Sequence, residues 1–248
     1  MISKITFDTK EVKIDFSKPI SIARPIASDK PSVKAWGVDH IDVNPVRDGD
    51  FIGDIAKGSS VNFKNLSVNP HGNGTHTECV GHIIEGDYFI GECLKQHIFL
   101  AQLISVSPIV KGDDFQITRE LLEAKISTQT LKAIIIRTLP NDLEKLNFNY
   151  TGTNPAYFTK GAIDYLNSIG VEHLLVDLPS VDKEQDSGRL EAHKLFWGVP
   201  GKIYDHKTIT ELVYVPNKIV DGSYVLQLAV PLMNIDAALS NPILYFEL

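Results

Sequence analysis

The sequence predicts a mixed α/β fold whose sheet contains both parallel and antiparallel strands. An apolar strand, an amphipathic helix and a second apolar strand follow one another between residues 133 and 177, and this order implies a parallel pair. From residue 203 onward, β-rich segments alternate with turn residues, which is typical of antiparallel strands. Hydrophobic residues make up 43% of the 248 residues, and the chain has no internal repeat or linker. We therefore expect one globular domain over residues 1–248.

Each expected element follows from its local pattern. Apolar residues at helical spacing predict a helix at 117–126 and another at 162–169, where Gly170 suits a left-handed C-cap. Turns are expected at Pro216-Asn217 and Asp221-Gly222. The expected strands are residues 12–16, 98–110, 133–137 and 171–177, and the last is followed by a polar loop at 178–188.

Charge and composition exclude several classes of protein. The net charge is −7 and no dense Lys/Arg run occurs, which counts against a nucleic-acid partner because phosphate binding needs a basic face. No apolar run reaches the roughly eighteen residues of a membrane span, and the N-terminus lacks the pattern of a signal peptide. Two cysteines fit a reducing compartment. We expect a cytoplasmic protein whose partner is a small molecule or another protein.

One segment carries a concentration of metal-ligand side chains. Residues 71–82 contain His71, His76, Glu78 and His82, and imidazole and carboxylate suit zinc, manganese or iron. Pro70 and three glycines argue against a helix here and predict a tight extended loop. In an extended segment the side chains at 76 and 78 leave the same face, and the one at 82 joins them if the extension persists. The alternative is a surface loop whose histidines are merely solvated.

The run Gly74-Thr-His-Thr-Glu-Cys-Val-Gly-His82 resembles the signature of the cyclase family, which includes bacterial kynurenine formamidases and isatin hydrolases. The likeness extends to Ile14–Ile20, to Leu175–Asp182, to His193 and to Glu211. It implies a swivelling β/β/α fold, a homo-oligomer (dimer or tetramer) and metal-dependent hydrolysis of amide-like bonds. An arylformamidase-like activity of tryptophan catabolism is its most specific implication. The resemblance assigns metal-binding or catalytic positions to His76, Glu78, His82, His193 and Glu211.

The chain departs from the family signature at three positions. Gly72 stands where the family has its first metal histidine, and His71 lies one residue too early. Either a one-residue bulge restores this ligand or the site has lost it. Glu78 replaces the usual aspartate with a side chain one methylene longer, and Val80 replaces a proline. A single ion is therefore expected rather than a pair.

The leading functional hypothesis is hydrolysis of a small amide, formamide or cyclic amide by a metal-activated water. His76, Glu78 and His71 would hold a divalent ion, with Zn²⁺ the first choice and Mn²⁺ the alternative. His82 or His193 would act as the general base or steady the oxyanion. In addition, Glu211 would be either a further ligand or the proton shuttle to the leaving group.

Two other hypotheses remain open at this point. The pocket could bind a ligand without turnover, or serve as an oligomer scaffold, or Cys79 could act as a nucleophile with His76 or His82 as its base. Arg137 could grip a substrate carboxylate, although a structural pair with Asp177 is the stronger reading. The aromatic candidates for a pocket wall, each of which could also be core, are Trp36, Phe63 and Trp197.

Overall fold

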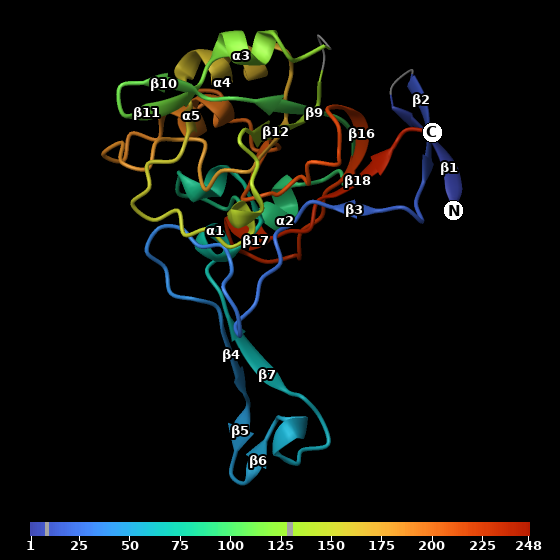
Figure 1. Cartoon of the computed structure of the whole chain (residues 1–248), viewed down its shortest axis with the longest axis vertical. Helices are drawn as coiled ribbons and strands as arrows, with labels where there is room; N and C mark the ends of the chain where they lie inside the picture. Colours follow the sequence, from blue (N-terminus) through green and yellow to red (C-terminus); the bar gives the residue numbers. More distant parts are fainter. Residues whose placement is uncertain (8–9, 128–130) are drawn as a thin grey trace.

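A computed structural model describes residues 1–7, 10–127 and 131–248 of the chain. Its centre is a nine-stranded mixed sheet with the strand order β17-β8-β15-β14-β12-β9-β16-β18-β3 (Figure 1). The strands of this sheet are β3 (Ile20–Ser21), β8 (His76–Glu78), β9 (Ile98–Val106), β12 (Ala133–Thr138), β14 (His173–Val176), β15 (Thr208–Glu211), β16 (Gly222–Gln227), β17 (Ala237–Leu239) and β18 (Ile243–Phe246).

Four neighbouring strands in the middle of the sheet, β9, β12, β14 and β15, run parallel, and the strands on either side are antiparallel. The predicted mixed sheet and the predicted parallel pair, β12 with β14, are therefore confirmed. The expectation of antiparallel strands after residue 203 holds for β16, β17 and β18. It holds only in part for β15, which is antiparallel to β8 but parallel to β14. The physical reason is the intervening helix α5 (Glu191–Trp197), because a parallel neighbour needs a crossover connection.

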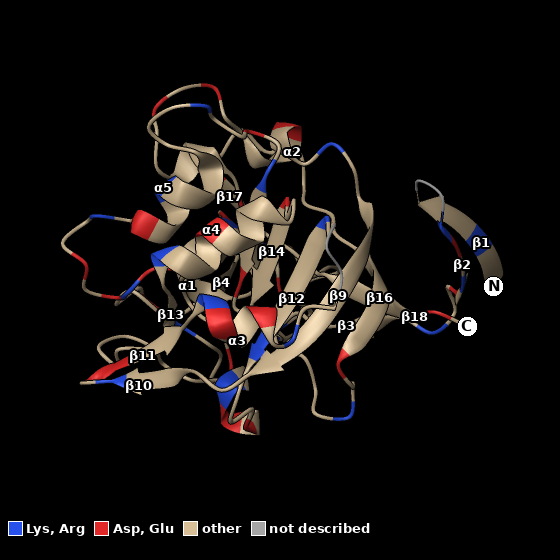
Figure 2. Cartoon of the chain, turned by 90° about the horizontal axis from the view of Figure 1, so that it is seen from above, with Lys and Arg blue, Asp and Glu red and all other residues tan. Residues whose placement is uncertain are grey.

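Helices cover one face of the parallel strands. Figure 2 shows α3 (Arg119–Glu123), α4 (Lys160–Ser168) and α5 lying over the sheet. Ile134 and Ile136 of β12 pack in the cluster that includes these helices, whereas Ile135 packs in the cluster on the opposite face. Because both faces are covered, all six residues of β12 are buried.

The helix limits agree in part with expectation. Helix α4 ends before Gly170, whose φ of +85° is the left-handed conformation predicted for it. Helix α3 is shorter than the predicted 117–126, because Ile117 already pairs in β11 (Asp114–Ile117). None of the helices in the described ranges is both long and apolar enough to cross a membrane.

A narrow arm projects from the body of the molecule between residues 42 and 67 (Figure 1). Large apolar side chains on this arm are exposed, among them Phe63 at 57% and Leu66 at 56%. The N-terminal hairpin instead packs Val12 and Ile14 against β16 and β18. Besides β11, α3, α4 and α5, the elements outside the main sheet are β1 (Ile2–Phe7), β2 (Lys10–Asp15), β4 (Asp42–Pro45), β5 (Arg47–Asp48), β6 (Phe51–Ile52), β7 (Lys64–Ser67), β10 (Ile109–Lys111), β13 (Tyr157–Phe158), α1 (Pro70–Asn73), α2 (Ile90–Cys93), and the 3₁₀ turns η1 (Ile55–Lys57), η2 (Val80–His82) and η3 (Leu143–Leu146).

Candidate metal centre

Strand β8 places two of the predicted site residues at the centre of the cluster. It lies between β15 and β17 and is antiparallel to both, with His76 directly opposite Glu211. Residues opposite one another in an antiparallel pair point to the same face, as do residues two apart on one strand. His76, Glu78 and Glu211 therefore share a face, and His76 Nε2 lies 3.5 Å from Glu211 Oε2.

The residues just before β8 form a helical turn rather than the predicted extended loop. Pro70 occupies the first position of α1, and the Asn69 side chain caps the turn by accepting a hydrogen bond of 3.1 Å from the Gly72 N–H. This capping and the proline favour the turn more strongly than Gly72 opposes it. The turn restores the displaced histidine to the site, because His71 Nδ1 lies 3.1 Å from Glu78 Oε2.

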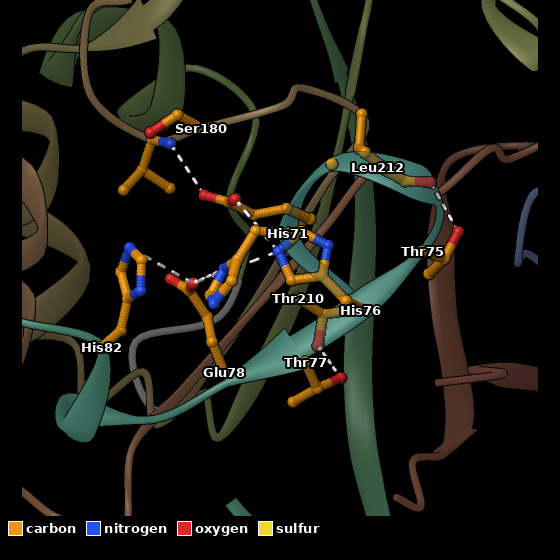
Figure 3. A network of polar contacts seen from close by, with 12 residues as sticks. His71, Thr75, His76, Thr77, Glu78, His82, Ser180, Thr210 and Leu212 are labelled. Atoms are coloured by element: carbon orange, nitrogen blue, oxygen red, sulfur yellow. Dashed lines mark hydrogen bonds and ion pairs between the residues drawn. The ribbon is translucent and has the colours of Figure 1, made fainter. Parts of the chain in front are cut away.

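Two further histidines approach Glu78 from other elements. His82 is the last residue of η2, and its Nε2 is 3.9 Å from Glu78 Oε2. His193 comes from α5, more than a hundred residues away, and its Nε2 is 3.0 Å from Glu78 Oε1. Figure 3 shows the rings of His71, His76 and His82 gathered around the Glu78 carboxylate. The structure thus brings together all six residues proposed from the sequence.

All four imidazole rings share one arrangement: one ring nitrogen contacts an acceptor outside the cluster and the other faces Glu78 or Glu211. Such outer acceptors fix the orientation and tautomer of metal-binding histidines. The outer contacts are His71 Nε2 with Asp236 Oδ2 (2.9 Å), His76 Nδ1 with Gly74 O (3.0 Å), His82 Nδ1 with Asp236 Oδ2 (3.1 Å) and His193 Nδ1 with Asp182 Oδ2 (2.6 Å).

Two atoms in the middle of this cluster lack a hydrogen-bond partner among the described residues. They are His76 Nε2 and Glu78 Oε2, and both residues are fully buried. A buried polar atom without a partner is costly, and two convergent atoms of this kind suit a cation that both can bind. The histidine and carboxylate donors fit a divalent ion such as Zn²⁺ or Mn²⁺. Three groups of potential ligand atoms lie within 4.8 Å of one another: His71, His76 and Glu78; Glu78, His82 and His193; and His71, His82 and Asp236.

The electrostatics of the cluster also favour positive charge. Burial disfavours ionisation of Glu78, but the charge of His82, a hydrogen bond from His193 and the close contact with His71 outweigh burial and hold its pKa well below the usual value. Burial likewise opposes protonation of His193, yet its carboxylate partners raise its pKa to about 10. Burial and the neighbouring Glu78 raise the pKa of Glu211. Imidazolium charge therefore balances the buried carboxylates, which is the role that a bound cation would take over.

A pocket of about 320 Å³ opens onto the cluster. Its floor includes His71, His82, His193 and Glu211, and Trp36 contributes an aromatic wall that is 40% exposed. The other two aromatic candidates do not line this pocket. Trp197 is fully buried in the core beside the His193 ring, and Phe63 lies on the arm.

Two candidate residues outside the cluster have structural roles. Arg137 pairs with Asp221 at 3.0 Å and donates a hydrogen bond to Ser105 Oγ. A structural role for Arg137 is therefore supported, but the prediction that it pairs with Asp177 is wrong. Asp177 instead accepts hydrogen bonds from Thr138 and Lys145.

The position of Cys79 weakens the thiol hypothesis. Its side chain is buried in an apolar cluster and donates to the Tyr88 carbonyl. A hydrogen bond with Cys93 and burial both raise the thiol pKa, which is the opposite of what a thiolate nucleophile needs.

Sequence reasoning missed the two aspartates that hold the imidazole rings. Asp182 falls within the family-like stretch 175–182, so its spacing of eleven residues from His193 was a usable signal. Asp236 lies outside every motif in the sequence. It reaches the site only because β17 pairs with β8.

Comparison with known proteins identifies the family of this chain. The Cyclase family model matches residues 14–183, which is more than half of the chain. The chain belongs to the cyclase family. No curated protein matches it significantly.

Solved structures agree with this cyclase-family fold. A potential metal-dependent hydrolase with cyclase activity superposes with a TM-score of 0.66 at 14% identity, over 92% of this chain and 97% of the other. A predicted metal-dependent hydrolase from Bacillus stearothermophilus superposes with a TM-score of 0.64 at 15% identity, over 92% of this chain and 98% of the other. An isatin hydrolase bound to the product analogue thioisatinate gives 0.63 at 14% identity, over 93% of both chains. At these identities the likeness shows the fold alone.

Proposed function

We propose that this cyclase-family protein is a metal-dependent hydrolase that cleaves a small amide, formamide or cyclic amide. The observation that carries the proposal is the pair of partnerless buried atoms, His76 Nε2 and Glu78 Oε2, which adjoin the pocket-lining residues Glu211 and His71. The ion is Zn²⁺, with Mn²⁺ as the alternative. His71, His76 and Glu78 hold it, and His82, His193 and Glu211 complete the cluster.

The chemistry divides between the ion and the protein. When bound, a divalent ion lowers the pKa of water and polarises the carbonyl group that is attacked. The His82 side chain is 31% exposed and lines the pocket, so it is the histidine best placed to take a proton at Nε2. His193 is buried and held by Asp182, which suits it to steady the developing oxyanion. Glu211, whose pKa is raised, supplies a proton to the leaving nitrogen.

The pocket rim favours uncharged substrates within this class. The rim carries Glu184 and Asp186, and its one lysine, Lys183, is paired with Asp114 at 2.7 Å. A substrate carboxylate would meet acidic side chains rather than an unpaired cation among the described lining residues. Arylformamides without a carboxylate and lactams such as isatin fit this rim best. An activity on formylkynurenine, which carries a carboxylate, stays a prediction from the family resemblance.

We also propose that the protein is a homo-oligomer, a dimer or a tetramer. The support is the projecting arm, where Phe63 and Leu66 are more than half exposed. Apolar side chains gathered on a projecting element are typical of a surface that a partner covers. A second copy of the chain is the proposed partner.

The decisive experiment compares metal content and activity in matched variants. Purified wild type, a His76→Ala, Glu78→Ala variant, and a control His40→Ala, Asp42→Ala variant are incubated with Zn²⁺ or Mn²⁺, desalted and measured by elemental mass spectrometry. His40 and Asp42 have the same spacing but are exposed. We expect about one ion per chain in wild type and control only, and hydrolysis of formanilide or isatin that chelator abolishes and metal restores. A wild type that takes up neither metal would overturn the proposal and leave a ligand-binding or scaffold role.

A further inference from the structure

Asp236 occupies a fixed position beside the cluster although it belongs to no motif. Its backbone carbonyl accepts a hydrogen bond of 3.0 Å from the Cys79 N–H, directly after β8. The preceding Ile235 carbonyl accepts from the Ile90 N–H at 2.9 Å. These bonds hold Asp236 at the end of the strand that carries His76 and Glu78.

One oxygen of Asp236 contacts two imidazole rings. Asp236 Oδ2 accepts from His71 Nε2 at 2.9 Å and from His82 Nδ1 at 3.1 Å, and the two ring centroids are 4.3 Å apart. Since a carboxylate oxygen only accepts, the proton on each ring is placed at the nitrogen that faces Asp236. In the neutral rings that metal binding requires, His71 Nδ1 and His82 Nε2 are then the nitrogens with lone pairs, and they face Glu78 Oε2.

The two rings that Asp236 holds are the two that the fold holds least. His76 is fully buried, and the His193 side chain is 3% exposed. By contrast, the side chains of His71 and His82 are 23% and 31% exposed, and both stand on single turns. His71 is also displaced by one residue from the family position, so an additional contact is needed to direct its ring.

We propose that Asp236 is a positioning residue that orients His71 and His82 toward the metal ion and so recruits the displaced histidine to the site. This inference rests on the metal-binding part of the proposed function. A direct ligand role is less consistent with the contacts, because Oδ2 already accepts from both rings. Glu78 Oε2, one of the two partnerless atoms, also faces the opposite nitrogens of these rings, His71 Nδ1 and His82 Nε2.

The test measures the Zn²⁺ dissociation constant of the full chain by competition with a chromophoric chelator. Asp236→Ala should weaken binding by about 10- to 100-fold, the usual effect of losing such an outer partner. Asp236→Asn keeps one acceptor oxygen and should weaken it less. The control, Asp48→Asn, removes the same charge from the exposed arm and should leave the constant unchanged. Thermal unfolding verifies that each variant is folded.

Two further measurements separate positioning from a general structural effect. In a His71→Ala, His82→Ala background, Asp236→Ala should cause almost no additional loss, because the rings it orients are gone. Nitrogen-detected NMR of the Zn²⁺-loaded protein, in which the ligand rings are neutral, should show the proton of His71 and His82 on the nitrogen that faces Asp236 in wild type and mixed tautomers in Asp236→Ala.

The possible results are distinct from those that test catalysis. A folded Asp236→Ala that binds Zn²⁺ as tightly as wild type overturns the inference, even if the enzyme is active. A loss in Asp236→Asn as large as that in Glu78→Gln also overturns it, because it would make Asp236 a ligand. A wild type that binds Zn²⁺ but hydrolyses no amide removes the proposed catalysis and leaves the role of Asp236 intact. A wild type that binds no Zn²⁺ overturns both.

Discussion

Gly72 stands where the family signature has a histidine, and the structure gives a steric reason that a substitution can test. A Cβ atom at this position would lie 2.6 Å from Val38 Cγ2 and 3.1 Å from the Ala35 carbonyl oxygen. The same backbone segment is held by a 3.0 Å hydrogen bond from the Ala35 N–H to the Gly72 carbonyl, so it resists a shift. With Val38 in place, the histidine is accommodated one residue earlier.

Gly72→Ala should therefore destabilise the protein. Overpacking of this kind costs about 2 kcal/mol, which for a chain of 248 residues is a fall of about 4–8 °C in Tm. The matched control is Gly161→Ala in α4, where the nearest heavy atom to the new Cβ is Arg119 Cβ at 3.8 Å. That substitution should leave Tm unchanged or raise it, because alanine is more favourable than glycine within a helix by up to about 1 kcal/mol.

Thermal unfolding followed by circular dichroism measures both effects in the metal-free protein. A Val38→Ala, Gly72→Ala variant provides the second arm, because removing the Val38 methyl groups removes the closest contact. Its loss of stability should be smaller than the sum of the losses in the single variants Val38→Ala and Gly72→Ala. The reasoning is refuted if Gly72→Ala unfolds at the wild-type temperature, or if the double variant shows simple additivity.

Three further predictions concern acid stability, substrate choice and assembly. Burial lowers the pKa of His173 to about 3; between pH 6.5 and 3 the unfolded state binds the proton and the folded state does not, so stability falls as pH falls. In urea titrations, the free energy of unfolding of wild type should fall by about 2 kcal/mol more than that of His173→Asn between pH 7 and pH 5. The same pH dependence in both proteins would disprove this role of His173. The acidic rim predicts that the Zn²⁺-loaded enzyme has a kcat/KM for formanilide at least about tenfold above that for 2-formamidobenzoate, whereas a preference for the acid would contradict it. Light scattering should show a dimer or tetramer that Phe63→Ser, Leu66→Ser shifts to a smaller species; an unchanged mass would exclude the arm as the contact.

Several features of this protein could be predicted from the sequence because they depend on near neighbours in the chain. Alternation along a strand is enough to place His76 and Glu78 on one face, and β8 confirms it. The strand, helix and strand between 133 and 176 could be recognised from apolar spacing, as could the left-handed Gly170. The family resemblance then supplied His193 and Glu211, which local patterns do not distinguish, and the structure places both at the cluster.

Other features were decided only by the tertiary structure, because they depend on which distant segments pair. The sequence left open whether His71 was lost, and the answer depends on a capped turn and on Val38, thirty-three residues away. Asp236 contacts the site because β17 lies beside β8. Arg137 pairs with Asp221 rather than Asp177 for a similar reason, because the pairing of β16 with β9 brings the turn at Asp221 next to Ser105 of β9. Spacing along the chain thus defines the face a side chain occupies, whereas strand order and register determine its partners.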